Sequence, residues 1–454
     1  MTGISRRTLL GGAVAGGALA ATPLATARAN VRSNAAPASF ALMTPAQTVA
    51  ARTDRRPVAG AVHDPAAGKT FIAWGGQYEN GFVQAYDHRT RTWSAPAQVT
   101  AGENDSHNYP TILQAADGHV LIVVGMHNEG TMVARSPRPH SIDGTWDVRT
   151  VAEGAAASYP MPFRTRSGEI FVFFRETTET IDPSVPSDTR PMLYLRSRDH
   201  GRTWQRSSAL TGAPYALGST DRADHLNEIY IGQLRHDPGG HGRPERVHLV
   251  WTLAGGGPAQ HLHDWFHKDI YYASFDPRTL HFHAPGGRDL GVQLTDAEQE
   301  GACQVALTPL ARPAAQKSPD YIQLVGTVGD SRPFVVWSTA DDAGLWHVFA
   351  AHWTGTWHTA EIASGLRCRE MERVSRDVWR VYTTRDGQPG VATYLLRPGR
   401  GWRAEATIPT AKPVQRIELV TGFRDPARVL ITGASSAREV SVADGDVQVA
   451  GLSR

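Results

Sequence analysis

Two histidines twenty positions apart, His107 and His127, are the first residues in the chain whose types and spacing suggest chemistry. Between them lie an apolar-rich run at 111–113, a turn at Asp117-Gly118, and a second apolar run at 120–124. This order predicts two antiparallel strands joined by an Asp-Gly turn. Because a hairpin brings its outer ends together, the two imidazoles could sit side by side at one edge of a sheet. Histidine changes charge near neutral pH, so the pair indicates an acid/base site.

The next predicted hairpin repeats this layout with Tyr159 and Arg175, which lie sixteen positions apart on either side of a Ser167-Gly168 turn. Taken singly, a Tyr-Pro at a strand start is often a packing residue, and an arginine after Phe-Phe is often a salt-bridge partner. Four such residues in equivalent positions of adjacent units favour function instead. We therefore expect a catalytic set at one mouth of the fold, made of His107, His127, Tyr159 and Arg175.

Composition limits the classes of protein that could position these residues. The chain has 454 residues, of which 41% are hydrophobic and 20% charged, as in ordinary soluble globular proteins. A net charge of +2 and the absence of a Lys/Arg cluster interleaved with aromatic residues argue against nucleic acid as a partner. No stretch after the N-terminus is long and apolar enough to predict a membrane anchor.

Short strand-like runs alternate with turns from Arg56 nearly to the end, and many units end in a polar turn followed by tryptophan. Repeats of about 50–60 residues built from strands predict an all-β fold, a seven-bladed β-propeller. Residues 197–204 match the S-x-D-x-G-x-T-W pattern called the Asp-box, which we interpret as a structural turn. A pair of β-sandwiches and a β-helix are the alternatives.

The first residues predict export. Arg6-Arg7 precedes a Gly/Ala-rich apolar run at 11–25, and residues 27–29 offer a small-x-small cleavage site. We interpret 1–29 as a twin-arginine signal peptide, with a transmembrane anchor as the alternative. Residues 30–55 are expected to form a flexible leader, and 56–454 the catalytic propeller domain of a secreted protein. Twin-arginine export carries folded proteins, which favours a metal ion loaded before export.

The pattern H-N-x-P, hairpin, G-x-H, then S-Y-P, hairpin, F-R resembles the seven-bladed propeller polysaccharide lyases, chiefly the ulvan lyases, and their relatives that act on rhamnose–glucuronate linkages. The resemblance covers the chain from about residue 56 onward and is specific between residues 105 and 176. It implies that His107, His127, Tyr159 and Arg175 form a lyase site.

The chemistry that this resemblance implies is β-elimination at a 4-linked uronic acid. The proton on C5 is removed and the oxygen on C4 is expelled, without a cofactor in the reaction. A cation such as Arg175 would offset the carboxylate charge and stabilise the enolate-like transition state. A neutral histidine can take the proton. Tyr159 can protonate the leaving oxygen or take the C5 proton, and the sequence does not decide between these roles.

Other residues are weaker candidates. The family often carries a structural zinc held by His and Cys, so we expect a structural metal, zinc rather than calcium, at His263, His267 and Cys303. A solvated histidine-rich loop is the alternative, and Cys303 could instead pair with Cys368. Substrate-binding residues at the same mouth are expected to include Asn108, Arg222 and His225.

The sequence therefore predicts a secreted, monomeric polysaccharide lyase whose partner is an acidic polysaccharide or oligosaccharide. Ulvan and rhamnose-capped arabinogalactan or gum side chains both satisfy this interpretation. One alternative is a glycoside hydrolase on the same scaffold, acting on rhamnosyl-glucuronate or resembling a sialidase. The other is a propeller that binds carbohydrate without cleaving it.

Overall fold

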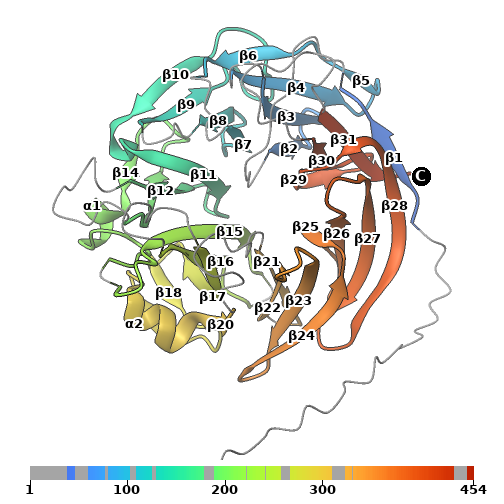
Figure 1. Ribbon diagram of the computed structural model, residues 1–454. Coiled ribbons are helices and arrows are strands. Elements are labelled where there is room, and N and C mark those ends of the chain that lie inside the picture. The colour runs from blue at the N-terminus through green and yellow to red at the C-terminus, as the bar shows by residue number, and fades with distance from the viewer. Residues whose placement is uncertain are drawn as a thin grey trace, which may run out of the picture. The chain divides into compact units, whose positions relative to one another are not determined.

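A computed structural model describes residues 38–45, 60–76, 80–102, 109–124, 129–177, 189–220, 222–240, 242–256, 266–308, 323–329, 331–433 and 447–453. All of these residues belong to one compact unit, Pro37–Arg454. They form six β-sheets and only short helical segments, which confirms the all-β prediction. Figure 1 shows the sheets following one another in chain order from blue to red.

Three of the sheets come from the first half of the chain, and each is an antiparallel meander. The first comprises β2 (Ala61–Asp64), β3 (Lys69–Gly75), β4 (Gly81–Asp87) and β5 (Thr92–Trp93), with β6 (Ala97–Thr100) also paired with β4. The second comprises β7 (Pro110–Gln114), β8 (Val120–Val124), β9 (Thr131–Arg135) and β10 (Asp147–Val151). The third comprises β11 (Ala157–Arg164), β12 (Ile170–Glu176), β13 (Met192–Ser197) and β14 (Gln205–Arg206).

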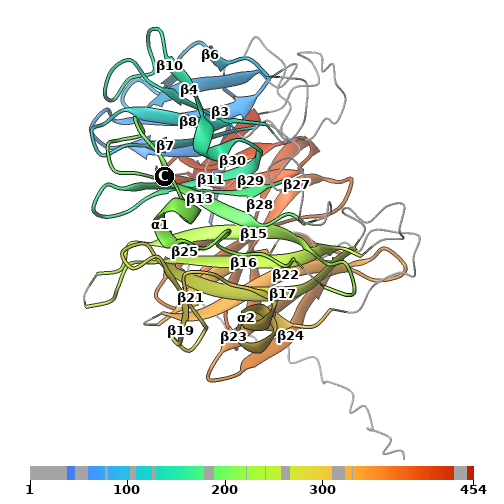
Figure 2. The same cartoon turned by 90° about the vertical axis from the view of Figure 1, so that its left-hand side faces the viewer.

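Later sheets repeat the meander. The fourth comprises β15 (Glu228–Asp237), β16 (Arg246–Gly255), β17 (Phe266–Asp276), β18 (His281–His283) and β19 (Asp289–Gly291), with β20 (Gln304–Ala306) paired with β17. The fifth comprises β21 (Gln323–Val328), β22 (Arg332–Ala340), β23 (Trp346–Trp353) and β24 (Trp357–Ser364). The sixth comprises β25 (Arg367–Ser375), β26 (Val378–Thr384), β27 (Pro389–Arg397) and β28 (Gly401–Pro413). The long strands β15, β16 and β17 lie side by side in both views (Figure 2).

The two ends of the chain complete one further set of strands, which joins the first sheet. It comprises β29 (Arg416–Arg424), β30 (Ala427–Thr432), β31 (Val447–Leu452) and β1 (Phe40–Met43). β29 pairs in parallel with β2 through Val62 and Thr421. The expectation of a flexible leader at 30–55 therefore differs from the structure, since Phe40–Met43 pairs with β31. In this pairing the backbone of β1 is hydrogen-bonded to β31, and its four apolar side chains are half-buried: Phe40, Ala41, Leu42 and Met43.

The first strands of these units contact one another across the fold. β2 contacts β7, β7 contacts β11, β21 contacts both β15 and β25, and β25 contacts β29. The third sheet reaches β15 through a bridge between Arg190 and Glu228. Apolar side chains fill the space between neighbouring sheets: one cluster joins Phe71 and Val83 of the first sheet to Ile112 and Ile122 of the second.

Turn chemistry explains the two predicted hairpins. Gly118 and Gly168 both adopt positive φ, of 83° and 93°, which glycine reaches without steric cost. Pro110 lies opposite Val124 in the first hairpin, and Ser158 lies opposite Arg175 in the second. Both hairpins are therefore confirmed, and each brings its two outer ends together.

The Asp-box at 197–204 is a structural turn, as predicted. Asp199 accepts hydrogen bonds from the Thr203 backbone and hydroxyl at 2.8 and 2.6 Å, and from Ser197 Oγ at 2.9 Å. Partial burial opposes ionisation, but hydrogen bonds from Thr203, Ser197 and Arg202 lower the pKa of Asp199 to about 2. The Asp199 carboxylate therefore holds the turn between β13 and β14 closed.

Helical structure is limited to short segments in the described part of the chain. These are α1 (Ser207–Thr211), α2 (Asp296–Glu298), a 3₁₀ turn (Ala152–Gly154) and a π-helical segment (Gln299–Cys303). α2 begins with a capping box in which Thr295 and Glu298 bond each other's backbone. No helix among the described residues is long and apolar enough to cross a membrane.

Candidate active site

Arg175, near the end of β12, lies between two tyrosine rings. Its Cζ is 4.5 Å from the centroid of Tyr159 and 4.4 Å from that of Tyr230, and the residue is 1% exposed. Burial opposes its charge, but Tyr230, Tyr159 and Glu228 raise the pKa of Arg175, which therefore stays cationic. The structure brings together the predicted pair Tyr159 and Arg175 and adds Tyr230 to it.

Two donor atoms of this buried cation are unused. Neither Nε nor Nη1 of Arg175 has a hydrogen-bond partner among the described residues. A buried charged donor without a partner is costly, and most such groups in folded proteins are satisfied. A guanidinium with free N–H groups can donate charge-assisted hydrogen bonds to the oxygens of a carboxylate. The arrangement can therefore bind a carboxylate and hold its charge.

Tyr159 owes its position to a β-bulge. Ser158 pairs with Arg175 and Met161 with Phe173, so Tyr159 and Pro160 together face a single residue of β12. Tyr159 has a φ of 59°, in the left-handed region that non-glycine residues rarely adopt. Strain of this kind concentrates at functional sites, and bulges re-aim side chains there. The bulge places the Tyr159 ring 6.0 Å from that of Tyr230.

Glu228, fully buried at the start of β15, places a negative charge behind the site. Its Oε2 lies 3.9 Å from Arg190 Nε, and Arg190 Nη1 donates to Thr177 Oγ1 at 3.2 Å. Glu228 is also one of the groups that raise the pKa of Arg175. Sequence reasoning missed Tyr230 and Glu228, which lie more than fifty positions beyond Arg175 and carry no local motif.

Two of the three predicted metal ligands, His267 and Cys303, lie among the described residues. His267 is fully buried in β17, and its ring meets the Tyr230 ring edge-on at 4.5 Å. Cys303 is a free cysteine in an apolar cluster, and burial raises the pKa of its thiol to about 12. Within the described ranges, no three His, Cys, Asp or Glu side chains form a metal-binding group.

Several predicted residues lie outside the described residues: His107, Asn108, His127 and His263. Their predicted roles stay predictions. Cys303 and Cys368 form no disulfide with each other, so the alternative of a bond between them is wrong.

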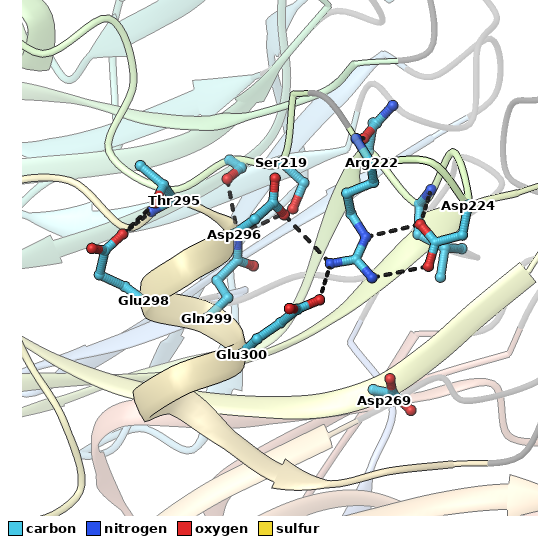
Figure 3. Close-up of polar contacts among 12 residues, drawn as sticks. Ser219, Arg222, Asp224, Asp269, Thr295, Asp296, Glu298, Gln299 and Glu300 are labelled. Atoms are coloured by element: carbon cyan, nitrogen blue, oxygen red, sulfur yellow. Dashed lines mark hydrogen bonds and ion pairs between the residues drawn. The ribbon is translucent and has the colours of Figure 1, made fainter.

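Arg222, predicted to bind substrate, is held by three carboxylates (Figure 3). Its Nε and Nη2 donate to the two Asp224 oxygens, each at 2.9 Å. Nη1 donates to Glu300 at 2.5 Å and lies 3.5 Å from Asp296. Neighbouring His225 has a φ of 56°, and its backbone N–H donates to the Arg222 carbonyl. A substrate anion would have to displace carboxylates from Arg222.

Gln299 hydrogen-bonds the residues that shortly precede Arg222. Its Nε2 donates to the Gly218 carbonyl at 2.9 Å and to Ser219 Oγ at 3.1 Å, while its Oε1 accepts from Trp251 Nε1 at 2.9 Å. Gln299 and Arg222 thus fasten residues 218–220 and 222–227 to the α2 region (Figure 3). This segment leads directly into β15, which carries Glu228 and Tyr230.

Replacing Arg222 with glutamine is expected to lower Tm by about 2–5 °C, because it leaves three neighbouring carboxylates without their cation. Their partial exposure keeps the effect modest. Differential scanning calorimetry measures it. Arg198→Gln, which breaks an exposed pair with Glu169, is the matched control and is expected to shift Tm by less than about 1 °C. An unchanged Tm with a raised KM would instead make Arg222 a substrate ligand.

Comparison with known proteins supplies the family. The sequence model of a BNR repeat-containing family member matches residues 69–364. The chain belongs to this BNR repeat-containing family. It is also 24% identical over 266 residues to the ulvan lyase of Alteromonas sp. (strain LOR), covering 52% of this chain and 51% of that relative. The "Ulvan Lyase-PL25" of Pseudoalteromonas sp. (strain PLSV) is 21% identical over 258 residues, covering 50% and 48%. The chain thus spans about half the length of the curated relatives it matches.

Solved structures show the same fold. A polysaccharide lyase "PL25-Ulvanlyase bound to -[GlcA(1-4)Rha3S]-" superposes with a TM-score of 0.68 at 17% identity, covering 89% of this chain and 94% of that one. The polysaccharide lyase Uly1 gives a TM-score of 0.56 at 12% identity, covering 87% and 89%. The resemblance to ulvan lyase-like BNR-repeat proteins that the sequence indicated is confirmed.

Proposed function

We propose that this protein is a polysaccharide lyase that cleaves at a 4-linked glucuronate by β-elimination. The observation that carries the proposal is Arg175, a buried cation with two unused donors beside the Tyr159 ring. Elimination next to an ionised carboxylate needs a fixed positive charge, because charge spreads from C5 onto that carboxylate in the transition state. The family membership and the named relatives support the same reaction class.

In the proposed mechanism Arg175 binds the uronate carboxylate through a charge-assisted hydrogen bond from Nε or Nη1. Tyr159, fixed by its bulge, handles a proton at C5 or at the leaving oxygen on C4. His107 and His127 are the remaining proton carriers in the proposal. No metal or organic cofactor takes part in the proposed steps.

The proposed substrate is an acidic polysaccharide in which glucuronate is linked to rhamnose. Support comes from the relatives named as ulvan lyases and from the one whose structure is bound to -[GlcA(1-4)Rha3S]-. Ulvan and rhamnose-capped gum side chains are both within this class. We further propose that the protein acts as a monomer outside the cell after twin-arginine export.

We also propose that the sheets form a seven-bladed propeller. Seven units of four or more strands can be counted when the chain-end strands β29, β30, β31 and β1 are separated from the first sheet at its single parallel bridge. Contacts between the first strands of successive units support this arrangement. In a propeller these strands line the centre, and substrates bind where they begin or end.

Incubation with uronate-containing polysaccharides, followed by far-UV absorbance, tests the proposed reaction. Elimination creates a C4–C5 double bond conjugated with the carboxylate, so absorbance should rise in step with the release of reducing ends. Reducing ends without absorbance would make the protein a hydrolase. If neither signal appears with any polysaccharide that the protein binds, it is a binding protein rather than an enzyme.

A further inference from the structure

A second bulge holds Arg369 in β25 at the position that Tyr159 has in β11. In β25, Cys368 pairs with Thr383 and Glu370 with Tyr382, so Arg369 has no residue opposite it. Both Tyr159 and Arg369 are the third residue of the first strand in their sheets. A bulge at this place re-aims the side chain that it carries. The fold therefore presents an arginine in one unit where it presents the candidate catalytic tyrosine in another.

Arg369 is a buried cation without an acidic partner. It is 9% exposed, and its Nε donates to Thr384 Oγ1 at 2.8 Å. No carboxylate of the described residues lies within ion-pair distance of it. Elsewhere in the same sheet Arg380, 4% exposed, is neutralised by Glu372 and Glu405. Burying an unpaired charge is unfavourable, so a buried arginine of this kind suits an anion that arrives from outside.

Two further arginines lie near Arg369, and the nearer, Arg367, is paired with Asp386 at 2.8 Å. Burial, nearby Arg367 and, to a smaller extent, Arg416 lower its pKa to about 9, against the opposing effects of Asp386 and Cys368. Arg416, 7% exposed at the start of the contacting strand β29, has its Cζ 5.1 Å from the Tyr109 ring. Like charges repel each other, and an anion between the two strands would relieve that repulsion.

These arginines lie at the same end of the strands as the candidate active site. Tyr109, against Arg416, directly precedes β7, whose first residue Pro110 pairs with the last residue of β8. Shortly after β8, Glu129 bridges Ala157, the first residue of β11. Tyr159 and its contact with Arg175 follow two residues later. A polysaccharide bound over Arg175 could therefore reach the starts of β25 and β29 along the same edge.

We propose that Arg369, supported by Arg416, forms a second anion-binding subsite that holds a carboxylate or sulfate ester on another sugar of the substrate. This inference rests on the proposed function and extends it, because it requires the substrate to carry at least two anionic groups. The carboxylate of the uronate being cleaved binds Arg175. The second anion then determines which linkage of the polysaccharide lies at the cleavage site. Arg369 is a binding residue with no part in proton transfer.

Steady-state kinetics of four proteins test the subsite: wild type, Arg369→Gln, Arg369→Lys and Arg385→Gln. Arg385 is exposed directly after β26, so its variant removes the same charge from solvent-facing surface. The substrates are ulvan oligosaccharides and the same oligosaccharides after chemical desulfation. Arg369→Gln should raise KM about 10- to 100-fold with kcat nearly unchanged, because a charge-assisted contact in the bound complex is lost. Arg369→Lys should give a smaller rise, and Arg385→Gln none.

Desulfation identifies the anion. A KM effect confined to the sulfated substrate assigns the subsite to a sulfate ester, and an equal effect on both assigns it to a carboxylate. The proposal is overturned if Arg369→Gln matches Arg385→Gln on both substrates. Should Arg369→Gln not fold, a wild-type KM for Arg369→Lys on both substrates overturns it equally. If the wild type yields no unsaturated product, the proposed function fails by itself. Calorimetric titration of the same oligosaccharides then tests the subsite, which requires weaker binding to Arg369→Gln than to Arg385→Gln.

Discussion

Arg175→Lys is expected to reduce kcat about 10²- to 10³-fold with little change in Tm. Lysine keeps the charge but loses the planar guanidinium, whose Nε and Nη1 are the donors left unused in the structure. The loss should appear in kcat because the carboxylate gains charge only as C5 is deprotonated. Initial rates from far-UV absorbance and a thermal melt of the same sample measure both quantities.

Arg380→Lys provides the matched control for that experiment. Arg380 is also a buried arginine, but its partners are the carboxylates of Glu372 and Glu405. This variant should lower Tm while kcat stays close to the wild-type value. If Arg175→Lys behaves in the same way, unstable and active, then Arg175 is a structural residue and the proposed lyase site is refuted.

Tyr159→Phe is expected to be at least as damaging as Arg175→Lys, with kcat reduced by about 10³-fold or more. Phenylalanine keeps a ring over the Arg175 guanidinium, so the packing at 4.5 Å persists and only the phenol is lost. The melting temperature should therefore stay within about 2 °C of the wild-type value. Single-turnover rates with a saturating substrate report the chemical step.

Tyr230→Phe is the matched control that separates proton transfer by Tyr159 from support of Arg175. Its ring lies as close to Arg175, at 4.4 Å, and its phenol helps to raise the arginine pKa. We expect a loss of about 10-fold or less from Tyr230→Phe, as for a group that supports Arg175 without transferring a proton. The reverse order of effects would assign the proton to Tyr230 and leave Tyr159 as the supporting ring.

Local sequence was sufficient for the hairpins and for the pairing of Tyr159 with Arg175. The Asp117-Gly118 and Ser167-Gly168 turns set the register of strands that are adjacent in the chain, and register then places the outer ends. The bulge at Tyr159 was not predictable in this way, because an extra residue in a strand leaves no distinct pattern of apolar residues. The Asp-box turn was predictable because all its hydrogen bonds lie within five residues of Asp199.

Contacts between distant units were beyond such reasoning. Arg222 looked like a substrate ligand although Asp224, two positions later, is one of its partners. Its other partner Glu300 lies 78 positions away and could not be read from the sequence around Arg222. Tyr230 and Glu228 reach Arg175 only because β15 begins beside the third sheet, through the bridge from Arg190. A site assembled from several sheets depends on how the sheets are placed, and that information is spread over the whole chain.

Pairing of β1 with β31 has a consequence for how the protein folds. Phe40 lies opposite Leu452, so the last set of strands joins residues more than four hundred positions apart. Contacts of such sequence separation form late, since the entropy of closing the intervening loop must be overcome before they stabilise anything. A ribosome-bound chain could complete its internal sheets one after another, yet β1, made first, and β30 would wait for β31, made last. Until then their open edges would offer the nascent protein's most exposed sites for aggregation.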